Sequence, residues 1–532
     1  MATNGAVAPL SRPQRLTLLA CILGSSTAFL DGTLVNVALP SIRADLHGGL
    51  ATQQWVVDGY LLTLGSLLLV GGSLGDIFGR RRVFAWGVAG FGATSLLCAV
   101  APDATLLIAA RALQGVAGAM LVPSTLALIM DTFQEHQRAA AIGAWTAWTG
   151  IATAIGPLAG GLLVQLGSWR WIFVVNVPFV AATLWLLKHA PRGVVAAREH
   201  VDWTGGLLAA LGLGGPVFAL IEQPHYGWSS GRVWPALVIG CALIVCFVLW
   251  ERRCSAPMLP LELFAVRNFS VGNVATFAFY AALGTTTFFL VVFLQEVAGY
   301  SPLASGLSLL PLSVLMFLLA RRFGALADRY GPRLFMGLGP LVTAGGLFWL
   351  LVGVDAHASY ASEVLPGVVL FAFGLALTVA PLTAAVLGSV GSGHSGVASG
   401  VNNAIARVAG MIAVAAVGAA VAGSFSGAVT TRLPAAVRTG AAAQRAAGRP
   451  FVLDASAFAS AQRPAARRVL VSASVDAFRL AMGIAAALAA FSGLLSLLGI
   501  SNPRRSVTSA EGSGERAARG SPGGAAEPVG AT

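Results

Sequence analysis

The feature of this sequence that most restricts its fold is the recurrence of long apolar runs separated by polar segments. A helix needs about 20 apolar residues to cross the hydrocarbon core of a bilayer, and fourteen runs come near or exceed this length. Hydrocarbon offers no water to unpaired backbone groups, so such runs are expected to fold as transmembrane helices. The predicted spans are residues 16–39, 54–75, 83–101, 105–130, 139–166, 171–188, 203–222, 233–250, 270–295, 303–323, 334–354, 363–388, 396–423 and 477–500.

The composition predicts the same class of protein. Of 532 residues, 56% are hydrophobic and 10% are charged, which is typical of an all-helical integral membrane protein. The net charge of +12 does not predict nucleic-acid binding, because the arginines lie between apolar runs rather than on one face. The cysteines at positions 21, 98, 241, 246 and 254 form no metal-binding spacing and predict no disulfide framework. The first 15 residues show no cleavage pattern, so we expect the first span to be retained.

The distribution of basic residues predicts the orientation in the membrane. An even number of spans puts both termini on one side, and cytoplasmic termini place 20 basic residues in cytoplasmic segments. The short outer loops then hold three, Arg43, Arg170 and Arg232, which is a strong positive-inside bias. The outer segment 424–476 and the approach to the last span hold eight more, but long segments cross with little regard to charge. We therefore expect a multi-pass protein of a bacterial plasma membrane with both termini in the cytoplasm.

An internal repeat divides the spans into two halves. Residues 72–81, Gly-Ser-Leu-Gly-Asp-Ile-Phe-Gly-Arg-Arg, recur after span 10 as residues 324–333, Gly-Ala-Leu-Ala-Asp-Arg-Tyr-Gly-Pro-Arg. Two six-helix bundles with two inserted helices reproduce this register, and parallel halves with a site between them are typical of secondary transporters. The expected parts are a cytoplasmic N-terminus 1–15, an N-terminal bundle 16–190, inserted helices 200–252, a C-terminal bundle 268–500 with a long outer loop 424–476, and a disordered cytoplasmic tail 501–532.

Two opposite charges lie at the same depth in the predicted spans. Asp31 in span 1 and Arg111 in span 4 are each about two turns from the outer end. A charged residue at a helix centre costs about 2.5–3.5 kcal/mol to insert, so it usually faces a cavity or a partner. The two charges can pair, and a proton or the cargo can then compete for the aspartate. A structural ion pair is the alternative.

Other residues of these spans are further candidates for the same site. Gln114, Gly115 and Gly118 share one helical face with Arg111. Asp58 near the outer end of span 2 and Glu296 at the end of span 9 are further candidate proton sites, although a carboxylate at a membrane interface is equally expected to be solvated.

Several stretches resemble the fourteen-span drug:proton antiporter branch of the major facilitator superfamily. Residues 30–40, Leu-Asp-Gly-Thr-Leu-Val-Asn-Val-Ala-Leu-Pro, resemble its first-span signature almost residue for residue. Residues 54–60 resemble the opening of its second span, and residues 169–178 resemble its fifth-to-sixth junction. Residues 111–118 resemble the family motif whose arginine is implicated in proton handling. The stretches 295–302 and 396–403, the second followed by Arg407, also resemble the branch.

Two motifs carry more specific implications. The stretch 72–82 resembles the cytoplasmic gate of the superfamily: Gly72 and Gly79 would allow a tight turn and close helix approach, and Asp76 and Arg80 could form charge-assisted bonds. A plain positive-inside anchor is the alternative. The second copy of the repeat adds Asp328 and Arg333 as further gate candidates. In span 5, five residues resemble the motif that marks antiporters, although small residues also serve helix packing; they are Gly150, Gly156, Pro157, Gly160 and Gly161.

The resemblance implies proton-coupled export of hydrophobic, often cationic or aromatic drugs from the cytoplasm or the inner leaflet. A dedicated exporter of one native metabolite, such as a self-made antibiotic, is the alternative. Bulky amphipathic cargo would need aromatic and polar side chains in a central cavity. The cavity candidates are Asn36, Tyr60, Trp148, Phe277, Tyr280, Asn402, Asn403 and Arg407.

Other classes of protein lack support in the sequence. No HExxH, GxSxG or Cys/His grouping predicts an enzyme, and no ATP-binding loop occurs, so a gradient must supply the energy. A receptor or scaffold would not need Asp31, Arg111 and the span 5 motif together. We expect a monomer without metal or cofactor, with small hydrophobic substrates, protons and the lipid bilayer as its partners.

The orientation is testable by labelling. Single cysteines placed within Ser424–Arg468 should react with an impermeant reagent added to intact cells, because the predicted topology puts this segment outside. Labelling that requires permeabilised cells would show that the predicted topology is inverted.

Overall fold

The computed structural model describes residues 10–189, 201–255, 257–390, 395–438 and 440–502. All regular structure in this part of the chain is helical, and fourteen helices are long and apolar enough to cross a membrane. The predicted all-helical membrane fold is confirmed. The predicted disordered tail, apart from its first two residues, lies outside the described residues.

The helices follow the chain order of the predicted spans. The first six spans are α1 (Arg12–Asp45), α2 (Leu50–Phe78), α3 (Arg80–Ala99), α4 (Ala104–Thr132), α5 (Glu135–Leu166) and the broken pair α6 (Trp171–Val174) and α7 (Asn176–Lys188). The next two are α8 (Trp203–Tyr226) and α9 (Val233–Arg253). The remaining elements are η1 (Leu261–Ala265), α10 (Arg267–Glu296), α11 (Pro302–Ser308), α12 (Leu310–Tyr330), α13 (Pro332–Gly353), η2 (Tyr360–Val364), α14 (Leu365–Gly388), α15 (Ser395–Arg432), α16 (Ala435–Arg438), α17 (Ala441–Ala447) and α18 (Arg463–Gly499).

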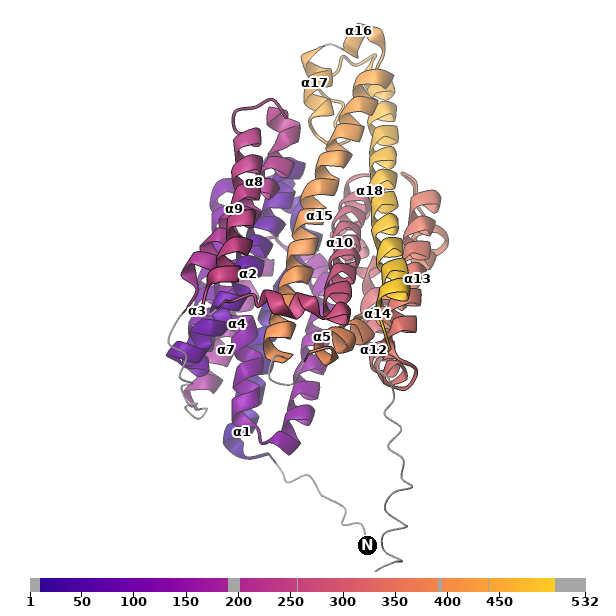
Figure 1. Cartoon of the computed structure of the whole chain (residues 1–532). Helices are drawn as coiled ribbons and strands as arrows, with labels where there is room; N and C mark the ends of the chain where they lie inside the picture. Colours follow the sequence, from indigo (N-terminus) through magenta and orange to yellow (C-terminus); the bar gives the residue numbers. More distant parts are fainter. Residues whose placement is uncertain (1–9, 190–200, 256, 391–394, 439, 503–532) are drawn as a thin grey trace, which may run out of the picture. The chain divides into compact units, whose positions relative to one another are not determined.

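The two ends of the bundle are distinguished by the elements they carry. Helix α1 begins and α18 ends at one end, which we call the terminal face, whereas α16 and α17 lie at the opposite end, the far face (Figure 1). We call α1–α7 the N half, α10–α18 the C half, and α8 with α9 the insert.

Helices α15 and α18 are much longer than the spans predicted for them. They contain 38 and 37 residues, or about 55 Å each at 1.5 Å per residue, against a hydrocarbon core of about 30 Å. The two ends of the segment 424–476 therefore extend these two helices beyond the far face, and α16 and α17 cover their ends (Figure 1). An ion pair of 2.6 Å between Arg432 and Asp476 joins the extensions. Phe451 and Phe458 of the connecting segment are buried, and the Phe451 ring packs near Phe289 and Phe293 of α10.

The repeated motif forms a one-residue turn in each half. Helix α2 continues to Phe78, and Gly79 alone turns the chain into α3 with a φ of +91°, a conformation that favours glycine. Gly331 makes the same turn between α12 and α13 with a φ of +89°. Gly72 lies inside α2, so the expectation that it forms part of the turn is wrong. Close approach of α2 to α4 depends instead on Gly71, where a Cβ atom would overlap the carbonyl oxygen of Ala119.

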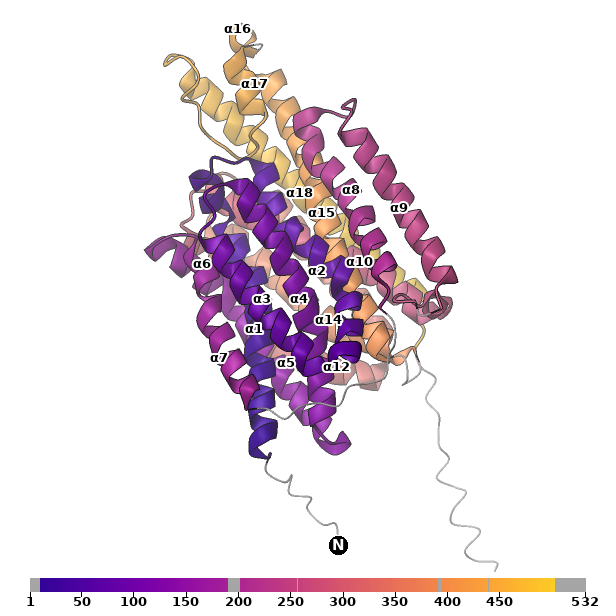
Figure 2. The same ribbon diagram turned by 90° about the vertical axis from the view of Figure 1, so that its left-hand side faces the viewer.

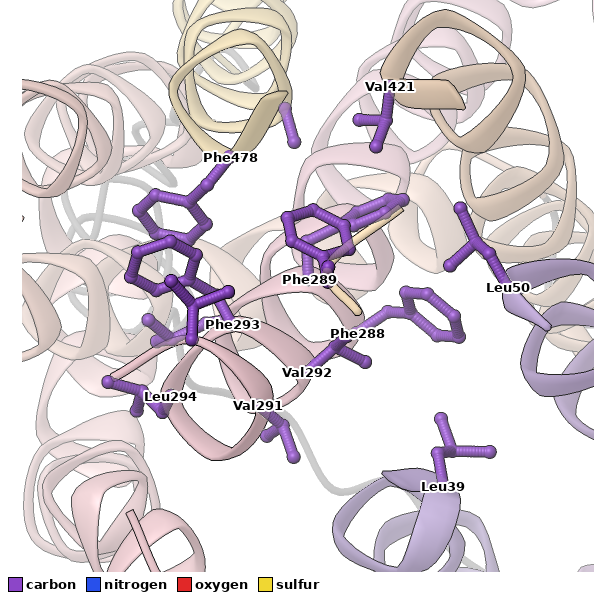
Figure 3. Close-up of a cluster of buried hydrophobic side chains, with 14 of the residues drawn as sticks. Leu39, Leu50, Phe288, Phe289, Val291, Val292, Phe293, Leu294, Val421 and Phe478 are labelled. Atoms are coloured by element: carbon purple, nitrogen blue, oxygen red, sulfur yellow. The ribbon is translucent and has the colours of Figure 1, made fainter. Parts of the chain in front are cut away.

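The two halves share an apolar core at the far face. This far-face plug buries side chains of α1 and α2 together with side chains of α10, α15 and α18, as Figure 3 shows for Leu39, Leu50, Phe289, Val421 and Phe478. Within the described residues, the other buried clusters draw their fully buried members from one half or from the insert and α15. Among the described residues, the largest apolar core that the halves share is therefore the far-face plug.

The insert covers one of the two seams between the halves. Helix α8 packs on α2 and on α15, and Val217 and Ile221 of α8 share a buried cluster with Met411 and Ala415 of α15. Trp55 of α2 contributes to the same cluster. Helix α9 packs mainly on α8 and exposes most of its surface (Figure 2).

The contact between α2 and α4 predicts unequal effects at two neighbouring glycines. Gly71→Ala should lower the stability of the protein by about 1–3 kcal/mol, because the methyl group has no room. Gly72→Ala is the matched control, since its nearest neighbour would be Pro123 at an ordinary 3.7 Å. Thermal unfolding of the purified variants in detergent measures the difference, and equal midpoints would contradict the close contact.

Candidate functional site

The predicted ion pair between spans 1 and 4 forms in the structure. Arg111 Nη1 lies 2.5 Å from Asp31 Oδ2. Both residues are buried, with 0% of Asp31 and 1% of Arg111 exposed. In so apolar a setting each charge is stabilised by the other, and removal of one partner of such a pair typically costs about 3–5 kcal/mol.

Three neutral polar side chains complete the hydrogen bonding around Asp31. The amide groups of Gln114 and Asn176 each donate to Asp31 Oδ1, at 3.1 Å in both cases. Both amides also donate to the Ser95 hydroxyl oxygen, at 2.9 and 3.2 Å. Gln114 was predicted, whereas Asn176 and Ser95 were not named as site residues. The sequence signal for these two residues was a polar amide and a polar hydroxyl within apolar spans. Neither group is charged, so neither was distinguished from the other neutral polar residues of the spans.

Arg111 is held by contacts other than the carboxylate. Its Nε donates to the Val56 carbonyl oxygen at 2.9 Å and its Nη1 donates to Gln114 Oε1 at 2.6 Å. Its guanidinium lies 4.4 Å from the centre of the Tyr60 ring. Tyr60, predicted to line a cavity, is 2% exposed and belongs instead to this buried cluster. The guanidinium would therefore keep three contacts if the carboxylate were neutralised.

Glycines bring the helices of this site into contact. A Cβ atom at Gly115 would overlap the Tyr60 carbonyl oxygen, so the glycine lets α4 approach α2 and places Arg111 against Val56. In α5, Gly156 and Gly160 fit against Thr33 and Leu34 of α1 in the same way.

The remaining residues of the span 5 motif either pack against the C half or have no close neighbour from another helix. Gly161 packs against Leu303, and the backbone of Pro157 packs against Gly306. Gly150 has no atom within 4 Å of the place its Cβ would occupy. Four of the five motif residues thus serve close packing of α5 against α1 or α11.

Asp58 is a buried acid on the seam between the halves. Gln54, Asp58, Gly65 and Leu69 share one face of α2, and Gln54 donates to the Val414 carbonyl oxygen of α15 at 2.7 Å. Gly65 and Leu69 also lie against α15. Asp58 is 0% exposed, and neither carboxyl oxygen has a hydrogen-bond partner among the described residues. Within the described part of the chain, the Asp58 carboxyl group therefore lacks the donors that the other buried acid of this half has.

Glu296 is not the freely solvated carboxylate that the sequence left open. Arg43 Nη2 lies 2.7 Å from Glu296 Oε2, and Arg43 Nε donates to Oε1 at 2.9 Å. This two-point ion pair connects α1 with the end of α10, beside the far-face plug. It therefore joins the two halves.

The gate motif forms charged contacts in the N half. Arg80 lies 3.2 Å from Asp76 and 2.5 Å from Asp131 at the end of α4. Asp131 was missed because it lies one residue beyond the predicted span. In the second copy, Arg333 donates to the Leu497 carbonyl oxygen at 2.6 Å, and Asp328 is exposed.

The remaining cavity candidates occupy different environments. Asn402 is buried within the C half and donates to Asn273 Oδ1 and Thr276 Oγ1 at 3.1 and 2.8 Å. Arg407 lies 5.8 Å from the Phe29 ring centre, across the two halves. Exposed members are Trp148, Phe277 and Asn403, and half-buried members are Asn36 and Tyr280.

An apolar groove of about 310 Å³ lies between α5 and α12. Ser313 is its one polar lining residue, and the others are Ile151, Ala154, Ile155, Leu158, Leu310, Val314, Phe317 and Leu318. The opposite seam, between α2 and α15, is covered by the insert. The seam between α5 and α12 is thus the more exposed of the two.

Comparisons with known proteins agree with this architecture. The sequence profile of the Major Facilitator Superfamily matches residues 21–414. The chain is 37% identical over 438 residues to the multidrug resistance protein Stp of Mycobacterium tuberculosis, covering 80% of each chain. It is 33% identical over 452 residues to the probable actinorhodin transporter of Streptomyces coelicolor, covering 83% of this chain and 77% of that one. A similar fold occurs in the inward-facing, unoccupied crystal structure of a bacterial homolog of the human lysosomal transporter Spinster, with a TM-score of 0.62. The two sequences are 15% identical, and the match covers 93% of this chain and all of that one.

The role of Asn176 in holding Asp31 is testable through stability. Asn176→Ala should destabilise the protein by about 1–3 kcal/mol, because a buried carboxylate loses one of its donors. Asn403→Ala is the matched control, since its exposed side chain donates, among the described residues, to the Ser399 carbonyl oxygen of its own helix. Thermal unfolding in detergent measures both variants, and an unchanged midpoint for Asn176→Ala would contradict the described network.

Proposed function

This chain belongs to the Major Facilitator Superfamily, and on that premise we propose that it exports hydrophobic, often cationic or aromatic drugs and antibiotics in exchange for protons. The substrates would leave from the cytoplasm or the inner leaflet. The similarity to multidrug resistance protein Stp supports drug export. The observation that carries the proton coupling is the buried Asp31–Arg111 pair, because it is a titratable charge sealed inside the N half.

The contacts of Asp31 support a competition between proton and arginine. As a carboxylate, Asp31 accepts from Arg111, Gln114 and Asn176. A proton on Asp31 removes its charge, while Arg111 keeps its bonds to Val56 and Gln114. The cluster then carries an uncompensated positive charge, which favours a rearrangement or the release of a cation. One charge crossing 100 mV is worth about 2.3 kcal/mol, and a pH gradient adds to this drive.

The packing supports an assignment of the conformational state. If the termini are cytoplasmic, the far-face plug closes the outer side and the structure faces inward. Opening outward would then require the plug to separate and the Arg43–Glu296 pair to break. The same movement would change the seam on which Asp58 lies, so Asp58 is the second candidate proton site. The gate residues Asp76, Arg80 and Asp131 would hold the terminal-face ends of the N half together.

The groove between α5 and α12 supports a route for apolar cargo. Its lining suits hydrophobic compounds, and it lies on the seam that the insert leaves uncovered. Compounds dissolved in the bilayer could therefore reach the protein from the side between α5 and α12. This placement favours hydrophobic over strongly polar cargo.

A dedicated exporter of one native metabolite is the second candidate. The similarity to a probable actinorhodin transporter favours it, because that protein is named for a single compound. In either case we propose a monomeric transporter without enzymatic activity. An accumulation assay over a panel of compounds separates the two candidates, since a dedicated exporter would lower the accumulation of only one chemical class.

The coupling role of Asp31 predicts a selective loss of transport. Asp31→Asn fixes a neutral side chain of nearly equal volume, so it should abolish uphill drug efflux from vesicles with an imposed pH gradient. Asp45→Asn is the matched control on the same helix, because Asp45 is exposed and pairs with Arg170 at 2.6 Å. Rates are compared per molecule of folded transporter. Uphill efflux by Asp31→Asn at the wild-type rate would place the proton site elsewhere, with Asp58 and Glu296 as the next candidates.

A further inference from the structure

Two carboxyl groups meet at the base of the insert, far along the chain from the transport site. Asp202 caps the first turn of α8, and Glu251 lies in the last turn of α9. Glu251 is only 3% exposed. Neither residue contacts Asp31, Arg111 or the gate among the described hydrogen bonds and ion pairs.

One oxygen of each carboxyl group is fixed by neighbouring donors. Asp202 Oδ1 accepts from the Gly205 N–H at 2.7 Å and from Trp250 Nε1 at 2.9 Å. Glu251 Oε2 accepts from the Leu259 N–H at 3.0 Å, in the segment that leads to η1 and α10. These bonds hold the two carboxyl groups in place.

The other two oxygens face one another without a donor. Asp202 Oδ2 and Glu251 Oε1 are both buried and have no hydrogen-bond partner among the described residues. A Cβ atom at Gly205 would overlap both oxygens, so the two oxygens are neighbours. The two side chains lie within hydrogen-bonding reach of each other. Two ionised carboxylates cannot bond each other, since each offers only acceptors.

No described cation neutralises this pair. Arg252 and Arg253 follow Glu251 on α9, but both are exposed and neither forms an ion pair with it among the described residues. Cys254 is the next titratable group on the chain, and Glu262 of η1 is exposed. On the α2 side, Gly206 packs against the apolar Val70. Residues 190–200 lie outside the described part of the chain.

We propose that Asp202 and Glu251 form a proton-binding site in which the two carboxyl groups share a single proton. That proton supplies the one missing donor, satisfies both orphan oxygens, and leaves one negative charge on the pair instead of two. Carboxyl groups forced together in this way hold one proton between them because they cannot both ionise at short distance.

The shared proton fastens three segments of the chain. It ties the start of α8 to the end of α9, and through Leu259 it ties both to the segment that enters the C half. Loss of the proton would set two carboxylates against each other and loosen the base of the insert. This site is independent of the transport proton, so its test does not depend on the proposed export function.

Infrared spectroscopy of the purified full-length protein detects the proton directly. In wild-type-minus-variant difference spectra at neutral pH, a protonated-carboxyl C=O band of the wild type should be missing from Glu251→Gln and also from Asp202→Asn. Glu262→Gln is the matched control and should retain the band. Persistence of this band in both single variants would overturn the proposal.

Pairs of amide substitutions give a second test with a specific sign. In Glu251→Gln the new amide donates to Asp202, and in Asp202→Asn it donates to Glu251, so each single variant keeps the bond without a proton. At neutral pH, both variants should have the same unfolding midpoint as the wild type. As the pH rises, the midpoint of the wild type should fall, whereas the midpoints of both variants should stay constant. The double variant places two amide donors against each other and should unfold at lower temperature.

A bound metal cation is the alternative occupant of this site, and the same two measurements distinguish it from a shared proton. If Na⁺ or Mg²⁺ raised the midpoint of the wild type but not of Glu251→Gln, and the protonated-carboxyl band were absent, the pair would be a cation site and the shared proton would be refuted. The shared proton would also be refuted if the single amide variants were clearly more stable than the wild type at neutral pH. Such a gain in stability would mean that both carboxylates of the wild type are ionised.

Discussion

The structure depends on one opposite-charge pair that is buried among apolar helices. Asp31 and Arg111 come from helices 80 residues apart in sequence, and burial makes each charge dependent on the other. Helices α2, α3 and α7 contribute Val56, Ser95 and Asn176 to the same cluster. The packing of the N half therefore follows from the need to surround this pair with donors and acceptors, and glycines such as Gly115 make the necessary helix contacts possible.

The far-face plug and the seams connect this local chemistry to movement of the halves. The plug and the Arg43–Glu296 pair join the halves at one end, while the insert spans the seam between α2 and α15. A transporter that alternates its access must break and re-form such contacts in each cycle. Within the described residues, the Arg43–Glu296 pair that joins the halves is partly exposed, whereas the Asp31–Arg111 pair inside the N half is buried.

Much of the fold could be predicted from the sequence because span length and hydropathy are local properties. The Asp31–Arg111 contact was predictable because two opposite charges at equal depth have few other ways to be satisfied. Asn176 and Ser95 were not predictable, since a neutral side chain in an apolar run carries no comparable penalty. The extension of α15 and α18 was not predictable from hydropathy, because a polar helix outside the membrane lacks the apolar signal. The contact between Asp202 and Glu251 was not predictable either, because it depends on how the insert folds back on itself.

The central claim is that Asp31 exchanges its proton for the cargo, and proton release on drug binding measures this most directly. A transported drug is added to purified protein in weakly buffered detergent solution, at a series of pH values that includes those at which Asp31 holds the proton, and the change in proton concentration is recorded. We expect the wild type and Asp45→Asn to release protons and Asp31→Asn to release none, although Asp31→Asn should still bind drugs that do not need the charge. An undiminished release by Asp31→Asn would show that another group exchanges the proton.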